Sequence, residues 1–248
     1  MNETRRQLLT TLSLAGAGAL LIGCSTAPAN RSGATNDDGK EPAPGEAAPI
    51  EVTATEDLMR EHGILRRALL VYQESAVRLR QDPAAMPAEA LEKTAQLFRV
   101  FGEDYHEKRL EEVYIIPLIR KVQGPVAAFA DVLVAQHARG REITDYLLSV
   151  SKGDRISAGQ VDSVAKALES FVRMYEHHAT VEDTVVFPAW KAAMGEQEYG
   201  ELGEKFEEIE TEIFGAEGFE TALKRMEEIE ASLGLTNLDM FTAPPPAK

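Results

Sequence analysis

The sequence is poor in cysteine and in positive charge, and each shortage excludes a class of protein. Its 248 residues include one cysteine, Cys24, which excludes an intrachain disulfide and any zinc or iron–sulfur site built from several cysteines. Lysine and arginine number 26 against 41 aspartates and glutamates, a net charge of −15. Such an acidic surface repels the phosphate backbone of nucleic acids, so neither DNA nor RNA is an expected partner.

Aromatic residues make up only 6% of the chain, and no segment alternates apolar and polar residues as a strand does. Apolar residues recur instead at intervals of three and four, which predicts amphipathic helices. Four long helices are expected near residues 55–80, 88–121, 126–151 and 157–194, the last with Ser157 as its N-cap, and two shorter ones near 196–214 and 219–233. The short connections predict an all-α fold, an antiparallel up-down four-helix bundle with one or two extra C-terminal helices.

The N-terminus reads as an export signal. The apolar run from Leu8 to Ile22 is short for a membrane span and fits the core of a signal peptide. Arg5-Arg6 before it resembles a twin-arginine signal. Gly23-Cys24 after it resembles a lipobox, in which Cys24 is lipidated; the alternative is an ordinary signal peptide with a chance cysteine. We therefore expect an exported lipoprotein, anchored to a membrane at the periplasm or cell surface.

The composition divides the chain into five parts. These are a signal peptide with lipobox (1–24), a disordered linker rich in alanine, proline and glycine (25–54), the four-helix bundle (55–195), a C-terminal helical extension (196–236) and a flexible tail (237–248). The role of the extension and the oligomeric state are not indicated by any pattern.

An internal repeat marks the second and fourth predicted helices. Residues 106–117 match residues 177–188 at a constant offset of 71. Each segment begins with a histidine followed by an acid or a second histidine, continues with an acidic pair and ends in a proline. The first and third helices each carry one histidine, His62 and His137. This alternation predicts a pseudo-symmetric core that holds two metal ions.

The residue types and spacing suit metal ligation. His178 and Glu182 are four residues apart and so share one helix face. Glu182 and Glu111 would each be a costly buried charge without a cation. Imidazole and carboxylate without thiolate suit iron, manganese or zinc, and two carboxylate-bridged metals held by histidines favour iron.

The repeat resembles the hemerythrin-like proteins, the HHE cation-binding family. The resemblance spans residues 56–194 and is carried by Tyr175-Glu176-His177-His178 to Phe187-Pro188 and by Tyr105-His106-Glu107 to Ile116-Pro117, with Glu61-His62 and Gln136-His137 in support. It implies a non-haem di-iron centre that binds or senses dioxygen, nitric oxide or iron, or handles peroxide. The ligands that it implies are His62, Glu111, His137, His178 and Glu182.

This sequence departs from the family at two places. The family has a histidine four residues before the second-helix acid, where this chain has Glu107; His106 lies five residues before Glu111. Either Glu107 is the ligand, or a local π-bulge brings His106 into register; we favour His106 and keep Glu107 as an additional carboxylate. Oxygen carriers also have a second third-helix histidine, where this chain has Arg141, which argues against simple oxygen carriage.

Two kinds of function fit these features. One is a binding or sensing protein whose di-iron site takes dioxygen, nitric oxide, peroxide or iron. The other is a di-iron oxidoreductase that removes peroxide, oxygen or nitric oxide. Ferritin-like iron oxidation ranks below both, because Glu-x-x-His occurs on one helix only, at Glu103 and His106. His177 points away from His178, and the tyrosine best placed near the metals is Tyr175.

Overall fold

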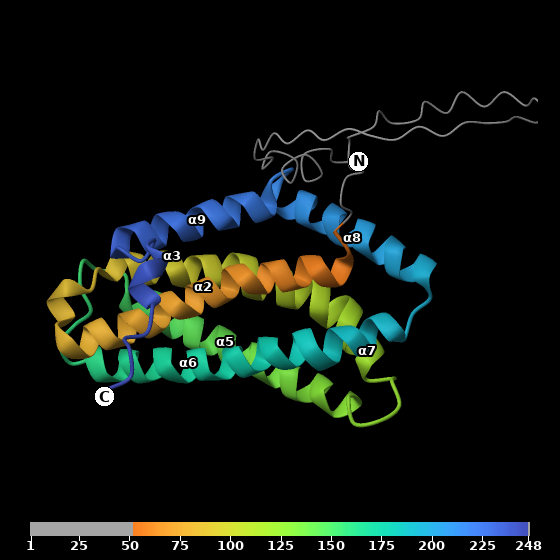
Figure 1. Ribbon diagram of the computed structural model, residues 1–248, viewed down its shortest axis with the longest axis horizontal. Coiled ribbons are helices and arrows are strands. Elements are labelled where there is room, and N and C mark those ends of the chain that lie inside the picture. The colour runs from red at the N-terminus through yellow and green to blue at the C-terminus, as the bar shows by residue number, and fades with distance from the viewer. Residues whose placement is uncertain (1–51, 248) are drawn as a thin grey trace, which may run out of the picture. The chain divides into compact units, whose positions relative to one another are not determined.

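The computed structural model describes residues 52–247, in which every regular element is helical (Figure 1). The predicted all-α bundle with extra C-terminal helices is confirmed. The predicted signal peptide, Cys24 and most of the predicted linker lie outside the described residues. Within residues 52–247, none of the helices combines the length and the apolar character that a membrane crossing requires.

Four helical columns form the bundle. The first is α2 (Ala54–Gln81), the second joins α3 (Ala88–Leu97), η3 (Phe98–Ile115) and α4 (Ile116–Ile119), the third is α5 (Ala127–Val150), and the fourth joins α6 (Val161–Val181), η4 (Glu182–Val186) and α7 (Phe187–Ala192). A short 3-10 turn, η2 (Pro83–Ala85), connects the first two columns. The column bounds follow the expected ranges to within a few residues, except at the start of the fourth.

The N-termini of α2 and α6 differ in whether a side chain caps them. At α2, Thr53 and Glu56 form a capping box, in which Thr53 Oγ1 accepts from Glu56 N and Glu56 Oε2 accepts from Thr53 N. The prediction of Ser157 as N-cap of the fourth column was wrong. α6 begins at Val161 after Gln160, and the Ser157 hydroxyl donates to the Gln160 side chain instead of capping a backbone N–H.

Two π-helical segments interrupt the α-helical columns, and each ends just before a proline. In η3 the last hydrogen bond runs from Ile116 N to Glu111 O, and in η4 it runs from Phe187 N to Glu182 O, both five residues back. Pro117 and Pro188 follow directly and cannot donate a backbone hydrogen bond. The wider turn therefore falls at the acidic residue of each repeat, which matters for the site below.

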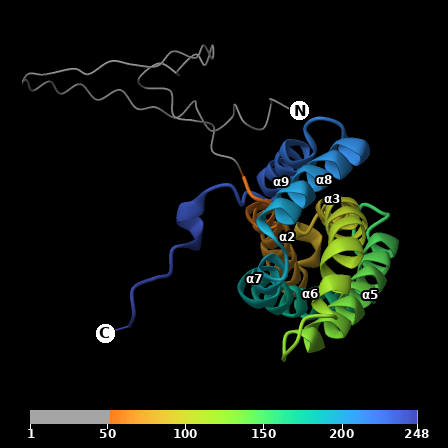
Figure 2. The same cartoon turned by 90° about the vertical axis from the view of Figure 1, so that its right-hand side faces the viewer.

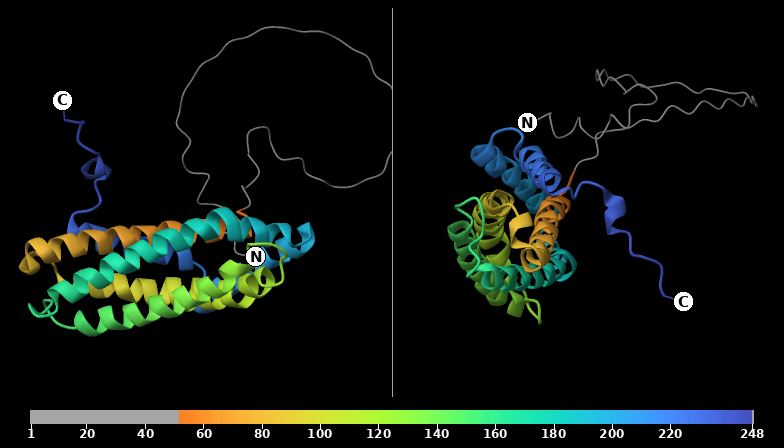
Figure 3. Two further views of the ribbon diagram at one scale, coloured as in Figure 1. Left: turned by 90° about the horizontal axis from the view of Figure 1, so that it is seen from below. Right: turned by 90° about the vertical axis from the view of Figure 1, so that its left-hand side faces the viewer.

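The extension packs along one side of the bundle (Figure 2). α8 (Glu196–Phe214) and α9 (Gly218–Leu233) contact α2, and α9 also contacts α3. Phe206 of α8 stacks on Trp190 at 5.9 Å between ring centroids, and Arg67 Nε of α2 donates to Glu230 Oε1 of α9 at 2.8 Å. Beyond α9 the chain leads away from the helices (Figure 3), with one 3-10 turn, η5 (Leu238–Phe241), inside the predicted tail.

Candidate metal centre

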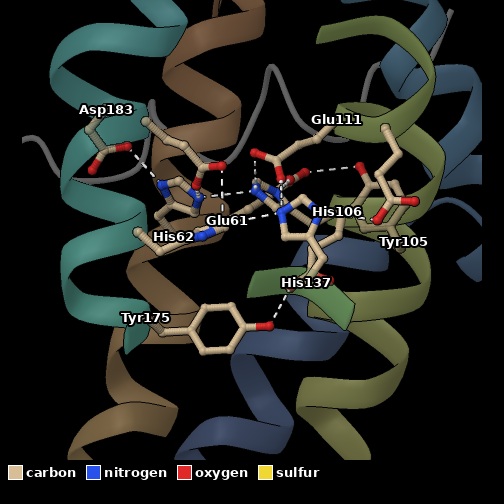
Figure 4. A network of polar contacts seen from close by, with 12 residues as sticks. Glu61, His62, Tyr105, His106, Glu111, His137, Tyr175 and Asp183 are labelled. Carbon is tan, nitrogen blue, oxygen red and sulfur yellow. Dashed lines mark hydrogen bonds and ion pairs between the residues drawn. The ribbon is translucent and has the colours of Figure 1, made fainter. Parts of the chain in front are cut away.

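Six buried ligand-type side chains meet in the middle of the bundle. They come from all four columns: His62 from α2, His106 and Glu111 from η3, His137 from α5, His178 from α6 and Glu182 from η4. None exposes more than 4% of its surface. Figure 4 shows His62 of α2, His106 and Glu111 of η3, and His137 of α5 converging on one region.

The first half of the cluster joins two histidines to two carboxylates. His62 Nε2 and His106 Nε2 face each other at 3.0 Å. His106 Nε2 lies 3.3 Å from Glu111 Oε1, and His62 Nε2 lies 3.4 Å from Glu182 Oε2. The two nitrogens and two oxygens thus surround one position.

The second half repeats this arrangement with the other oxygen of each carboxylate. His137 Nε2 and His178 Nε2 face each other at 3.2 Å. His137 Nε2 lies 3.2 Å from Glu111 Oε2, and His178 Nε2 lies 3.1 Å from Glu182 Oε1. Glu111 and Glu182 therefore each present one oxygen to either half, which is the arrangement of bridging carboxylates between two metal ions.

The π-helical register explains how His106 reaches the cluster. His178 and Glu182 are four residues apart, so an α-helical turn brings them together. His106 and Glu111 are five apart, and the i→i+5 turn of η3 places them on one face. At the offset of the repeat, His106 corresponds to His177, which is exposed, so the sequence match alone does not reveal the ligand pairs.

The outer nitrogen of each cluster histidine contacts an acceptor from another column. His62 Nδ1 pairs with Asp183 Oδ1 at 2.7 Å, His106 Nδ1 with Glu61 Oε2 at 2.6 Å, His137 Nδ1 with Glu112 Oε1 at 3.0 Å and His178 Nδ1 with Gln136 Oε1 at 2.8 Å. Such partners hold the proton on Nδ1 and aim the Nε2 lone pair inward, as in metal-bound histidines.

Sequence reasoning did not assign roles to Glu61, Glu112, Gln136 and Asp183. A signal was present, because each is the sequence neighbour of a cluster residue on the same helix. Each one orients a histidine that belongs to a different column. These four contacts link the first column to the second, the second to the third, the third to the fourth and the fourth back to the first.

The donor set fits metal ions better than a protein-only core. None of the four oxygens of Glu111 and Glu182 accepts a hydrogen bond, although all are buried. Buried carboxylates without donors are strongly unfavourable, and facing imidazole nitrogens about 3 Å apart repel when both carry bare lone pairs. These four histidine nitrogens and four carboxylate oxygens are the groups that would hold cations there.

In protein without metal, protons on some of the cluster histidines offset part of the negative charge of the buried carboxylates. Burial disfavours the charged imidazolium of His106, but Glu111 outweighs it and raises the pKa of His106 well above the usual value. Burial likewise opposes charging of His137, and neighbouring carboxylates, Glu107 first, raise its pKa to about 10. His106 and His137, one from each facing pair, are therefore cationic at pH 7.

The other members of the cluster respond to those charges. Burial, reinforced by charged His137, lowers the pKa of His178 to about 4. Burial and the nearby Glu111 charge raise the pKa of Glu182 well above the usual value. At pH 7 the cluster without metal therefore keeps protons that a metal must displace.

Metal loading at pH 7 is accordingly expected to release protons, about two per chain from His106 and His137 and a further contribution from Glu182. The raised pKa values mean that these groups bind protons before loading and lose them as ligands. Calorimetric titration with Fe²⁺ under anaerobic conditions, in buffers of different ionisation enthalpy, measures the number. Loading without proton release would contradict this assignment of ligands.

Glu107 lies beside the cluster rather than within either half. Tyr175 Oη donates to Glu107 Oε1 at 2.6 Å, and Arg141 Nη2 donates to Glu107 Oε2 at 3.1 Å. Arg141 Nη2 also donates to Glu112 Oε1 at 2.5 Å. Of the two candidates on the second column, the structure thus brings His106 to the facing nitrogens and leaves both oxygens of Glu107 bound to other groups.

A small cavity adjoins the centre. It has a volume of about 10 Å³, room for a molecule about the size of one water. His62, His106 and His178 form one part of its wall, and Leu65, Leu69, Phe98 and Ala179 form most of the rest. Arg66, Glu107 and Tyr175 are also in the wall. A small molecule can therefore stand between the histidines and a mostly apolar surface.

Comparison with known proteins agrees with this geometry. The profile of the hemerythrin HHE cation-binding domain matches residues 53–190 and, in a second overlapping match, residues 128–234. Proteins of Mycobacterium bovis and Mycobacterium tuberculosis, both described as uncharacterized, are 38% identical over 246 residues, which cover 96% of this chain and 90% of theirs. No solved structure matches significantly. The chain belongs to the hemerythrin HHE cation-binding family.

Proposed function

We propose that this protein holds two non-haem iron ions and binds a small ligand, dioxygen, nitric oxide or peroxide, at the cavity beside them. The proposal rests on one observation. Four buried carboxylate oxygens that accept no hydrogen bond lie beside two pairs of facing histidines, two oxygens at each pair. When bound, the metals supply Lewis acidity and electrons to a ligand in the cavity. The protein supplies the nitrogen and oxygen donors, their orientation and the apolar wall that excludes water.

Iron is preferred over manganese or zinc because of the ligand count. The second position would receive two imidazole nitrogens and two carboxylate oxygens. The first would receive two imidazole nitrogens and one oxygen of Glu111, with an oxygen of Glu182 3.4 Å from His62 Nε2. Iron accepts further ligands beyond these four, which leaves room for a small molecule, whereas a structural zinc site is complete with four.

A second candidate function is a di-iron oxidoreductase that removes peroxide, oxygen or nitric oxide. Arg141 favours the oxidoreductase. It occupies the position where oxygen carriers have a further histidine, and its guanidinium cannot bind a metal. Fewer nitrogen ligands leave more coordination positions for exchange. The two functions differ in turnover, so the same preparation can be used to distinguish them.

The direct test is the metal content and visible spectrum of the purified full-length chain after expression with ample iron. We expect both positions to be filled with iron, and near-ultraviolet bands that change on addition of oxygen, peroxide or nitric oxide. Catalytic disappearance of the added ligand indicates the oxidoreductase, and a stable adduct indicates binding. One zinc per chain, or no metal, would contradict the proposal.

We also propose that the protein acts at the cell envelope, exported through its Arg5-Arg6 signal and anchored through Cys24. The support is the sequence pattern alone: an apolar segment preceded by paired arginines and followed by Gly-Cys. Fractionation of cells that express Cys24→Ser should move the protein out of the membrane fraction. An unchanged membrane fraction would contradict the lipid anchor.

A further inference from the structure

Three residues from three columns form a connected group beside the metal centre. Tyr175 of α6 and Arg141 of α5 both donate to Glu107 of η3, one to each carboxylate oxygen, at 2.6 and 3.1 Å. Glu107 is 2% exposed and Tyr175 is 4% exposed. We call Tyr175, Glu107 and Arg141 the clamp. It has no place in the ligand set described above.

Gly140 makes room for the clamp. A Cβ atom at this position would stand 2.0 Å from Tyr175 Oη and 2.8 Å from Tyr175 Cζ. No real side chain tolerates such contacts, so the phenol can reach Glu107 only because residue 140 is glycine. Gly140 and Arg141 are consecutive on α5, where one admits the hydroxyl and the other holds the carboxylate.

Arg141 also connects the clamp to the metal centre. The same Nη2 that donates to Glu107 donates to Glu112, whose Oε1 contacts His137 Nδ1 at 3.0 Å. One guanidinium thus holds the carboxylate that orients a cluster histidine and the carboxylate that faces the cavity. The residue that departs from the oxygen-carrier pattern is therefore a structural support.

The clamp supplies hydrogen-bonding groups to the wall of the cavity. Glu107 and Tyr175 are in its wall, together with His62, His106 and His178. The remainder is Arg66 and leucine, phenylalanine and alanine side chains. A molecule that stands against the histidines therefore meets an acceptor carboxylate and a phenol oxygen next to one another.

We propose that the clamp makes the site selective for hydrogen peroxide over dioxygen and nitric oxide, with Tyr175 and Glu107 as the specificity-determining residues. This rests on the proposed di-iron function. Dioxygen and nitric oxide have no proton to donate, whereas hydrogen peroxide has two O–H donors and accepting oxygens. It can donate to Glu107 or to the Tyr175 oxygen, because both keep lone pairs beside the hydrogen bonds that they already make within the clamp. A carboxylate facing a ligand without a donor gains nothing and loses hydration.

The test compares Tyr175→Phe with the wild-type chain, both full length and loaded with ferrous iron. Stopped-flow spectroscopy gives the rate constant for reaction with hydrogen peroxide, and a spectroscopic titration gives the affinity for nitric oxide. We expect the peroxide rate constant to fall about ten-fold, as for loss of one hydrogen bond, and nitric oxide affinity to stay within about two-fold. Iron content should not change.

Two further variants keep the test decisive. Gly140→Ala retains the phenol but displaces it, and should reproduce the loss of peroxide reactivity. Tyr72→Phe is the matched control, because Tyr72 is equally buried in the bundle, its hydroxyl has no hydrogen-bond partner, and it is absent from the cavity wall. It should behave as wild type.

The outcomes separate this inference from the proposed function. Wild-type protein without iron would overturn both. Iron-loaded Tyr175→Phe that reacts with peroxide at the wild-type rate would overturn the inference alone. An equal fall in peroxide rate and nitric oxide affinity would also overturn it, because it would assign Tyr175 a general packing role.

Discussion

In the proposed di-iron centre, replacing Glu111 with alanine is expected to remove both irons. One oxygen of Glu111 lies 3.3 Å from His106 Nε2 in the first half and the other lies 3.2 Å from His137 Nε2 in the second. The substitution therefore takes one carboxylate oxygen from each half of the cluster at once. Loss of an outer partner alone typically lowers metal affinity 10–100-fold, so loss of a bridging ligand should lower it by more than about 100-fold at both positions.

The measurement is iron per chain after dialysis against a weak chelator. The neighbouring pair His177 and His178 provides matched controls on one helix, since His178 belongs to the second half and His177 is exposed. His177→Ala should retain both irons, and His178→Ala should lose iron mainly from the second half. Full iron loading of Glu111→Ala would refute the bridging assignment.

Much of the fold follows from local sequence rules. The apolar spacing and the breaks at Pro83, Gly124-Pro125 and Gly153 set four columns whose bounds the structure reproduces to within a few residues. The exception at Ser157 is instructive. Serine is a good N-cap because its hydroxyl can form a hydrogen bond with a free backbone group at the helix start. Here the Ser157 hydroxyl instead donates to the side chain of Gln160, three residues later.

The candidate site was predictable as a set of residues but not as two halves. The resemblance to the hemerythrin-like family implied His62, Glu111, His137, His178 and Glu182, and His106 was favoured over Glu107. The structure brings these six residues together. The pairing depends on the π-helical turn of η3, which changes which residue faces the core. A prediction that assumes 3.6 residues per turn throughout does not include such a π-helical turn.

The histidine orientation was beyond sequence reasoning for a different reason. Each Nδ1 partner lies on a column other than that of its histidine, as Asp183 does for His62 and Glu61 for His106 (Figure 4). Such pairings depend on how four columns pack, and spacing along one helix carries no information about them. The same holds for the clamp, which needs Gly140, Glu107 and Tyr175 from three columns.

Removal of the metals is expected to lower the melting temperature substantially without melting the helices first. Bound at 1,000 times its dissociation constant, one metal stabilises the folded state by about 4 kcal/mol. In a domain of this size, 1 kcal/mol shifts the melting temperature by about 2–4 °C, so each metal should contribute roughly 10 °C. Thermal melts followed by circular dichroism, with and without iron, measure the shift.

The same geometry predicts the form and the pH dependence of that effect. The proposed metal ligands come from all four columns, so bound metals would join columns to one another and add nothing to hydrogen bonding within a helix. Helical content at 20 °C should therefore be nearly equal in both forms. Since the raised pKa of His137, about 10, means that a proton competes for its nitrogen, the difference in melting temperature should shrink as pH falls. In Glu111→Ala, iron should no longer change the melting temperature, and equal melting of loaded and metal-free wild-type protein would show that the four columns pack independently of the metals.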